Sequence, residues 1–241
     1  SGPAKPLSAR FPRLEVPGKA GRATRVYATV RTPADLIALV QAGTLELHVW
    51  GSRAPDLEHP DQLVLDLDPG PDLGWSVVVE TARSLAGRLH QLGLASFVRT
   101  TGGKGLHLVV PLTPACDWST AKAFAHAVAA AHAADDPRRL TVNMAKSRRR
   151  GRIFIDYLRN GRGATAIASW STRARPGAPV AVPLDWDELS TAVTSDRFHV
   201  NNVQERLAAL SNDPWDGFEA ARRPLTRDLL VAAGAGEARS R

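Results

Sequence analysis

The chain has 241 residues, 44% of them hydrophobic and 23% charged, which is enough for one sizeable folded core. Its 31 Lys and Arg against 24 Asp and Glu give a net charge of +7, which favours a polyanionic partner, although many basic proteins have none. The single cysteine, Cys116, excludes an intramolecular disulfide and a multi-cysteine zinc site, and the lack of a long apolar run or a signal peptide predicts a cytoplasmic protein with no membrane partner.

The amino-terminal part of the sequence changes character at about residue 25. Residues 1–25 are rich in Pro, Gly, Lys and Arg and predict a loosely structured lead-in. Capping residues and an apolar face predict a helix over 32–42, and alternation predicts a strand over 45–50. His48 lies on one face of that strand, where packing beside Trp50 explains it at least as well as a ligand role.

Two carboxylates, Asp66 and Asp68, end an alternating apolar run that begins at Gln62. A strand places both on one face, with Cα atoms roughly 6–7 Å apart. Pro69 and Gly70 follow directly, so the acids lie at the mouth of the strand. Like charges this close repel unless a cation or a proton lies between them, and Mg²⁺ or Mn²⁺ completed by substrate phosphates is the natural candidate.

A glycine-rich connection between two short strands forms the second motif. Three glycines let backbone N–H groups approach a ligand, and Lys104 adds a charge suited to phosphate. Thr101 adds a hydroxyl, and His107 lies on the following strand where it can face the same cleft. A Gly-Gly hairpin with a chance lysine explains the pattern equally well.

The third motif combines a carboxylate with a basic run. Asp156 lies in an otherwise apolar strand, and a buried carboxylate is costly unless it is paired with an arginine or bound to a metal. A basic run precedes it and predicts either a solvated turn or a polyanion contact: Lys146, Arg148, Arg149, Arg150 and Arg152. Farther on, two arginines on one face, Arg173 and Arg175, close a strand of small residues.

The rest of the chain interleaves helices and strands without an internal repeat. Helices are predicted over 75–92, 118–134 and 203–210, and strands over 96–100, 106–111, 152–158 and 164–171. We expect one catalytic domain over 26–231 and a frayed tail over 232–241. Three acids, a glycine turn with lysine and histidine, and spaced arginines together suit a nucleoside triphosphate held with two metals.

The sequence resembles the polymerase module of bacterial DNA ligase D, a member of the archaeo-eukaryotic primase superfamily that acts in non-homologous end joining. The resemblance runs from about Leu14 to Leu230, and its motifs begin at Glu46 (ELHVW), Leu65 (LDLDP), Gly102 (GGKGLHLVVP), Phe154 (FIDYLRN) and Ser171 (STRAR). It implies an α+β fold, a primase-type catalytic core of mixed β-sheets flanked by helices. It also implies a nucleotidyltransferase that adds nucleotides, ribonucleotides by preference, to a DNA primer 3′-hydroxyl in end joining and short gap filling.

The resemblance also implies roles for individual residues. The metal-binding and catalytic triad is Asp66, Asp68 and Asp156, for two Mn²⁺ or Mg²⁺ ions. The nucleotide-binding set is His48, Thr101, Lys104, His107, Arg149 and Arg173. The DNA-binding set comes from the charge of the basic run rather than from the resemblance: Lys146, Arg148, Arg150 and Arg152. The implied partners are nucleoside triphosphates, DNA ends and gapped DNA on the nucleoid, Ku and a DNA ligase.

The sequence departs from the family pattern in two ways. Thr101 stands where the family usually has serine, which keeps the hydroxyl, and the amino-terminal part of the family module, with contacts to template and 5′-phosphate, is expected to be absent. The alternatives are a haloacid dehalogenase-type phosphatase, which also begins with Asp-x-Asp but commonly has Thr or Val where Gly70 stands, and a non-catalytic nucleic-acid-binding module.

Overall fold

The computed structural model describes residues 7–18 and 23–235, and the chain divides into two compact units, Ser1–Leu47 and His48–Arg241. No helix among the described residues is long and apolar enough to cross a membrane.

The first unit contains a strand pair and one helix. Strands β1 (Arg13–Val16) and β2 (Arg25–Ala28) pair in antiparallel register. Helix α1 (Pro33–Gln41) confirms the predicted helix. It begins at a capping box in which the Thr32 side chain accepts from the backbone N–H of Asp35 and the Asp35 carboxylate accepts from the backbone N–H of Thr32.

The prediction of a loosely structured lead-in is wrong for part of residues 1–25, because β1 lies there. Alternating Leu14 and Val16 pair across the strands with Tyr27 and Arg25, and Val16 is buried. Strand β2 supplies the backbone hydrogen bonds that stabilise β1. The composition of a short, Pro-rich segment does not indicate that such a partner strand exists.

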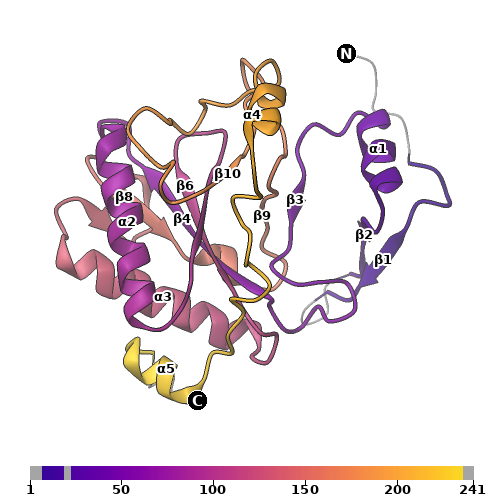
Figure 1. Cartoon of the computed structure of the whole chain (residues 1–241). Helices are drawn as coiled ribbons and strands as arrows, with labels where there is room; N and C mark the ends of the chain where they lie inside the picture. Colours follow the sequence, from indigo (N-terminus) through magenta and orange to yellow (C-terminus); the bar gives the residue numbers. More distant parts are fainter. Residues whose placement is uncertain (1–6, 19–22, 236–241) are drawn as a thin grey trace. The chain divides into compact units, whose positions relative to one another are not determined.

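The second unit is built on one six-stranded sheet with the order β10-β5-β6-β4-β8-β7 (Figure 1). Its strands are antiparallel neighbours except for the parallel pair β7 and β8. Their bounds are β4 (Gln62–Pro69), β5 (Phe97–Thr100), β6 (Leu106–Pro111), β7 (Leu140–Thr141), β8 (Ile153–Asp156) and β10 (Pro183–Leu184). A separate two-stranded sheet pairs β3 (His48–Val49) with β9 (Ala166–Ile167), both shorter than the predicted strands over 45–50 and 164–171.

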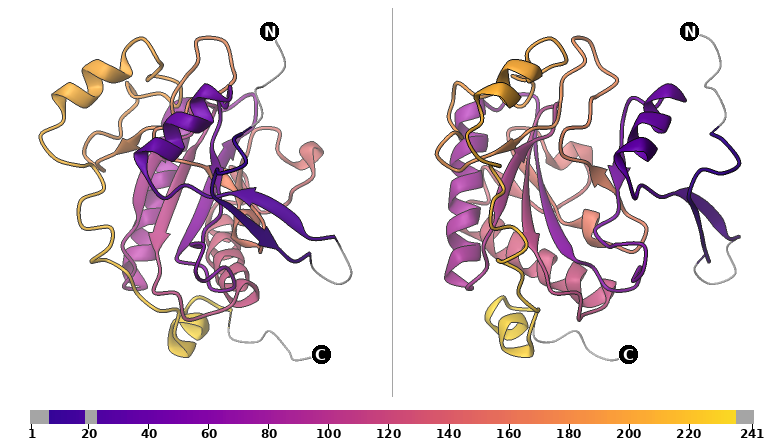
Figure 2. Two further views of the ribbon diagram at one scale, coloured as in Figure 1. Left: turned by 90° about the vertical axis from the view of Figure 1, so that its right-hand side faces the viewer. Right: turned by 45° about the vertical axis from the view of Figure 1, so that its right-hand side comes forward.

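Helices α2 (Trp75–Gln91) and α3 (Trp118–Asp135) confirm two predicted helices and pack on the large sheet (Figure 2). Helix α4 (Val203–Ala209) confirms the third, and the short elements η1 (Lys146–Arg148), η2 (Leu158–Asn160) and α5 (Arg227–Ala232) complete the chain. The predicted frayed tail lies outside the described residues from 236 onward.

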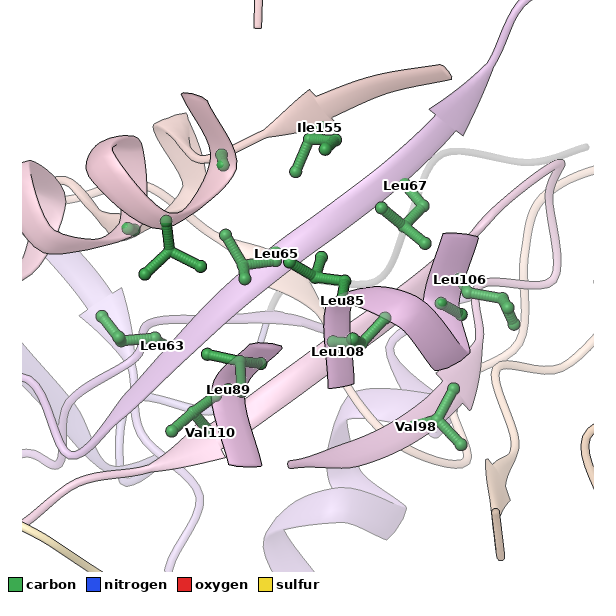
Figure 3. Packing of buried hydrophobic residues seen from close by; sticks show 14 of the residues in the cluster. Leu63, Leu65, Leu67, Leu85, Leu89, Val98, Leu106, Leu108, Val110 and Ile155 are labelled. Carbon is green, nitrogen blue, oxygen red and sulfur yellow. The ribbon is translucent and has the colours of Figure 1, made fainter. Parts of the chain in front are cut away.

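The central strand β4 separates the core from the opposite face of the sheet. Leu63, Leu65 and Leu67 are almost fully buried in the main core beneath α2 and α3, among residues such as Leu85 (Figure 3). Val64 points the other way into a smaller apolar cluster with Val109, Ala166, Trp215 and Phe218. Asp66 and Asp68 continue that second face beyond the apolar cover, so strand alternation delivers both acids to one surface.

The connection between β5 and β6 approaches β4 very closely at Gly105. A Cβ atom at Gly105 would overlap the carbonyl oxygen of Leu67, which is backbone and has no room to move. Glycine at this position is therefore a packing requirement of the turn beside the acids.

We predict that Gly105→Ala lowers the free energy of unfolding by about 1–3 kcal/mol, because the added methyl overpacks the turn. Gly87→Ala is the matched control, since a Cβ atom at Gly87 would meet nothing within 4 Å and alanine is the better helix former in α2. Chemical denaturation of both variants checks the pair. A Gly105→Ala protein as stable as the unmodified one would contradict the close approach.

Candidate active site

The register of three strands places three chemically active side chains on one face of the large sheet. Asp66 on β4 lies opposite His107 on β6 and opposite Asp156 on β8. Residues that face each other across neighbouring strands point to the same side of a sheet. Asp68 lies two residues farther along β4 and opposite Phe154, so its carboxylate shares that face.

Cationic side chains contact all three carboxylates. Arg159 places its Nη2 3.2 Å from the Oδ2 of Asp66 and its Nε 3.2 Å from the Oδ2 of Asp156. Arg149 donates from Nη1 to the Oδ2 of Asp68 at 2.8 Å. The arginine pairing that the sequence left open for Asp156 is therefore present. The side chains of residues 7–18 and 23–235 form no group of three or more His, Cys, Asp or Glu arranged to hold a metal ion.

The three carboxyl groups differ in their electrostatic environment. Burial alone would raise the pKa of Asp66, but His107 and Arg159 together lower it below the usual value. Burial raises the pKa of Asp68, and the neighbouring Asp66 raises it further. Burial likewise raises the pKa of Asp156, opposed by the backbone N–H of Leu158 and by Arg159. Further positive charge at this face would therefore favour the ionised form of all three.

His107 is held from behind by a buried arginine that the sequence analysis missed. Arg99 donates from Nε to the Nδ1 of His107 at 3.2 Å, and its Nη1 donates to the hydroxyl of Ser169. This contact assigns the proton of a neutral His107 to Nε2, which lies 3.5 Å from the Oδ2 of Asp66. Burial lowers the pKa of Arg99 to about 10 and also lowers the pKa of His107.

The glycine turn is held closed by a serine from a distant segment. The hydroxyl of Ser195 donates to the carbonyl oxygen of Gly105 at 2.6 Å, and the backbone N–H of Gly102 donates to the carbonyl oxygen of Ser195 at 3.0 Å. The Thr101 hydroxyl donates to the same Gly105 carbonyl at 3.1 Å. Gly102 has a φ of +62°, the left-handed region that glycine adopts without strain. Nothing in the sequence signals Ser195, which lies 94 residues beyond Thr101.

A cavity of about 220 Å³ lies over this face and collects most of the predicted site. Arg173 reaches it and donates from Nη1 to the carbonyl oxygen of Thr101 at 3.0 Å. The predicted residues that line the cavity are His48, Asp66, Asp68, Thr101, Lys104, His107 and Arg173. Arg159 and Arg175 line it as well; both lie in motifs noted in the sequence, where neither was given a role in the site.

The remaining predicted residues lie beside the cavity rather than on its wall. Asp156 contacts Arg159, which itself lines the cavity. Arg149 contacts Asp68 from the connection between β7 and β8. That connection also carries the predicted DNA-binding residues. Lys146, Arg148 and Arg150 are exposed and Arg152 is half-buried, and Arg150 lies 3.4 Å from Asp72.

Asn160 anchors the turn that carries Arg159. Its Oδ1 accepts from the backbone N–H of Val64 at 2.7 Å, and its Nδ2 donates to the carbonyl oxygens of Val64 at 2.8 Å and Tyr157 at 2.9 Å. Asn160 is only 2% exposed. The side chain therefore substitutes for a neighbouring strand at this point of β4 and fixes η2 against the sheet.

Comparison with known proteins identifies the family. The family model described as "LigD, primase-polymerase domain" matches residues 6–215. The chain belongs to this family. It is a primase-polymerase domain of the nucleotidyltransferase class, and this family assignment excludes the phosphatase alternative.

The relatives are consistent with this assignment. The "Multifunctional non-homologous end joining protein LigD" of Pseudomonas aeruginosa is 38% identical over 208 residues, which are 86% of this chain and 25% of that protein. The LigD protein of Mycolicibacterium smegmatis is 34% identical over 69% of this chain and 22% of its own length. The chain thus spans about a quarter of the curated relatives that it matches.

A solved structure confirms the predicted fold class. The "Polymerase Domain from Mycobacterium tuberculosis Ligase D in complex with DNA" superposes with a TM-score of 0.80 and 30% identity, over 89% of this chain and 76% of that one. The mixed α and β core of the primase-polymerase type is therefore the fold of this chain.

We predict that Asn160→Ala destabilises the protein by about 1–3 kcal/mol, because it leaves the buried N–H and C=O of Val64 without their partner. Asn143→Ala is the control, since Asn143 is exposed and its side chain accepts from the backbone N–H of Ala145 two residues away. Denaturant unfolding measures both. Equal stability of the two variants would show that Asn160 does not hold η2 on the sheet.

Proposed function

We propose that this chain transfers nucleotides from nucleoside triphosphates to the 3′-hydroxyl of a DNA primer, in end joining and short gap filling. The observation that carries the proposal is the meeting of Asp66, His107 and Asp156 across three strands, beside a cavity lined by Lys104 and Arg173. The family assignment supports the reaction class, and the tuberculosis homologue in complex with DNA supports the substrate.

Asp66, Asp68 and Asp156 would hold the divalent ions, Mn²⁺ or Mg²⁺. Their chemistry fits, because hard cations take carboxylate oxygens and Asp66 and Asp156 already converge on one cationic group, the guanidinium of Arg159. Ions held there would supply Lewis-acid chemistry for the attack of a hydroxyl at phosphorus and for the charge on the departing pyrophosphate. Arg159 and Arg149 would then release the carboxylates that they contact.

The basic residues of the cavity would hold the triphosphate. Lys104 lies at the glycine turn on the cavity wall and supplies a point charge. Arg173 offers a planar fork whose orientation is set by its bond to the Thr101 carbonyl. His107 presents Nε2–H as a donor, because Arg99 occupies its other ring nitrogen. Thr101, His48 and Arg149 belong to the same proposal as contacts at the edge of the nucleotide.

The basic side chains of the β7–β8 connection would follow the DNA backbone. Lys146, Arg148, Arg150 and Arg152 lie on the segment that also positions Arg149 beside Asp68. Each phosphate neutralised contributes a slope of about −0.9 in log K against log salt. The names of the relatives support a role in non-homologous end joining. The proposal further includes DNA ends and gapped DNA on the cytoplasmic nucleoid, a preference for ribonucleotides, and Ku and a DNA ligase as partners.

A primer-extension assay tests the proposed function. The chain is incubated with a primed gap in DNA, Mn²⁺ and one labelled nucleoside triphosphate at a time. Extended primer supports the polymerase, and faster extension with ribonucleotides supports the finer preference. Retention of the DNA without extension would instead support the non-catalytic binding module.

We predict that alanine at Asp66, Asp68 or Asp156 lowers the rate of extension roughly a hundredfold or more, because several kcal/mol of transition-state stabilisation is lost. Asp72→Ala is the control, since Asp72 is an exposed acid near the site that contacts Arg150. Circular dichroism verifies that each variant is folded. Extension near the unmodified rate removes that residue from the triad.

We predict that Arg173→Lys raises the KM for nucleotide, because a planar fork at a phosphate contact is lost, with little change in affinity for gapped DNA. Arg148→Ala should do the reverse and weaken DNA binding while the KM for nucleotide stays the same. Steady-state kinetics and a DNA titration at two salt concentrations measure both. An Arg173 variant that loses only DNA affinity belongs to the DNA surface instead.

A further inference from the structure

Arg159 occupies the position between two carboxylates that a divalent cation would otherwise take. Its Nη2 and Nε lie within 3.2 Å of Asp66 and Asp156, which face one another across β4 and β8. The side chains of both acids are only 13% exposed, whereas that of Arg159 is 41% exposed. A solvent-accessible cation thus neutralises two acids that are largely shielded from water.

The backbone under Arg159 is fixed independently of this contact. Asn160 binds the backbone of Val64 from the far side of the turn, and the backbone N–H of Leu158 donates to the Oδ1 of Asp156 at 2.8 Å. Besides its contacts with the two acids, the Arg159 guanidinium makes a long bond from Nη1 to the carbonyl oxygen of Thr165 at 3.5 Å. The side chain can therefore leave the carboxylates while η2 stays in place.

We propose that Arg159 is the resident counter-ion of the Asp66–Asp156 pair and that a divalent metal ion binds this pair by displacing it. The proposal rests on the metal site of the proposed function. One guanidinium carries a single positive charge against two carboxylates, so an ion of charge +2 neutralises them better. The competition between the two sets how tightly the metal-free protein binds its first ion.

After displacement, the Arg159 guanidinium can still bind an anionic ligand in the cavity. Arg159 lines the same cavity as Lys104 and Arg173, the residues assigned to the triphosphate. A side chain released from Asp66 therefore stays on the wall that receives an anionic ligand. The exchange would keep the acids neutralised before the metal arrives and add a positive charge for phosphate afterwards.

Mn²⁺ binding to the whole chain, without nucleotide or DNA, tests the exchange. Electron paramagnetic resonance of free Mn²⁺ gives the affinity of the unmodified protein, Arg159→Gln and Arg159→Lys. Removal of the competing charge should tighten Mn²⁺ binding by about tenfold in the glutamine variant, which corresponds to ~1.4 kcal/mol. The lysine variant keeps the charge and should bind Mn²⁺ less tightly than the glutamine variant.

A thermal-unfolding scan supplies a second measurement. Without metal, Arg159→Gln should melt at a lower temperature than the unmodified protein, because Asp66 and Asp156 face each other without their cation. Added Mn²⁺ should raise its melting temperature more than that of the unmodified protein. Arg139→Gln is the matched control, since Arg139 contacts Asp136 and Glu80 outside the site and the change in net charge is the same.

The outcomes separate this proposal from the metal site itself. Mn²⁺ affinity of Arg159→Gln that is equal to or weaker than that of the unmodified protein overturns the counter-ion role, as does equal tightening in Arg159→Lys or Arg139→Gln. If Arg159→Gln is unfolded without metal, Arg159→Lys is compared with the unmodified protein instead. A weaker affinity of Arg159→Lys for Mn²⁺ then overturns the proposal. If Asp66→Asn binds Mn²⁺ as the unmodified protein does, the proposed metal site fails instead.

Discussion

The register of β4 against its two neighbours is the constraint on which the candidate active site depends. It places Asp66 opposite His107 on one side and Asp156 on the other. A slip of one residue would move the carboxylates of β4 to the core face and its leucines to the surface. The buried leucines therefore hold the acids in position, because burying their apolar surface gives a free energy that only this register delivers.

The three acids on this face are balanced by two arginines from the turns on either side of β8. Arg159 reaches Asp66 and Asp156 from the turn after β8, and Arg149 reaches Asp68 from the turn before it. His107 approaches Asp66 from β6 with Arg99 behind it. Because carboxylates this shielded are costly without partners, this charge balance explains how the sheet tolerates three acids together.

The wall of the cavity is assembled from segments that are remote in the sequence. Ser195 closes the glycine turn, and Arg173 contacts the carbonyl of Thr101. Trp215 covers the neighbouring apolar part of the same sheet face and donates from its indole to the carbonyl of Val98. This part of the sheet thus keeps its shape through side chains that follow it by 72 to 117 residues.

Local pattern in the sequence determined the long helices, the face of β4 that carries Asp66 and Asp68, and the glycine turn with Lys104, because these follow from periodicities of two or 3.6 residues and from glycine's backbone freedom. Tertiary structure alone decided the strand register, the bridging position of Arg159, the buried contact of Arg99 with His107, and the pairing of Asn160 with the backbone of Val64. The physical reason is the separation along the sequence of the residues that interact. A period reports which way a side chain points, whereas a hydrogen bond or an ion pair between distant residues exists only once the packed core has brought their atoms within about 3 Å.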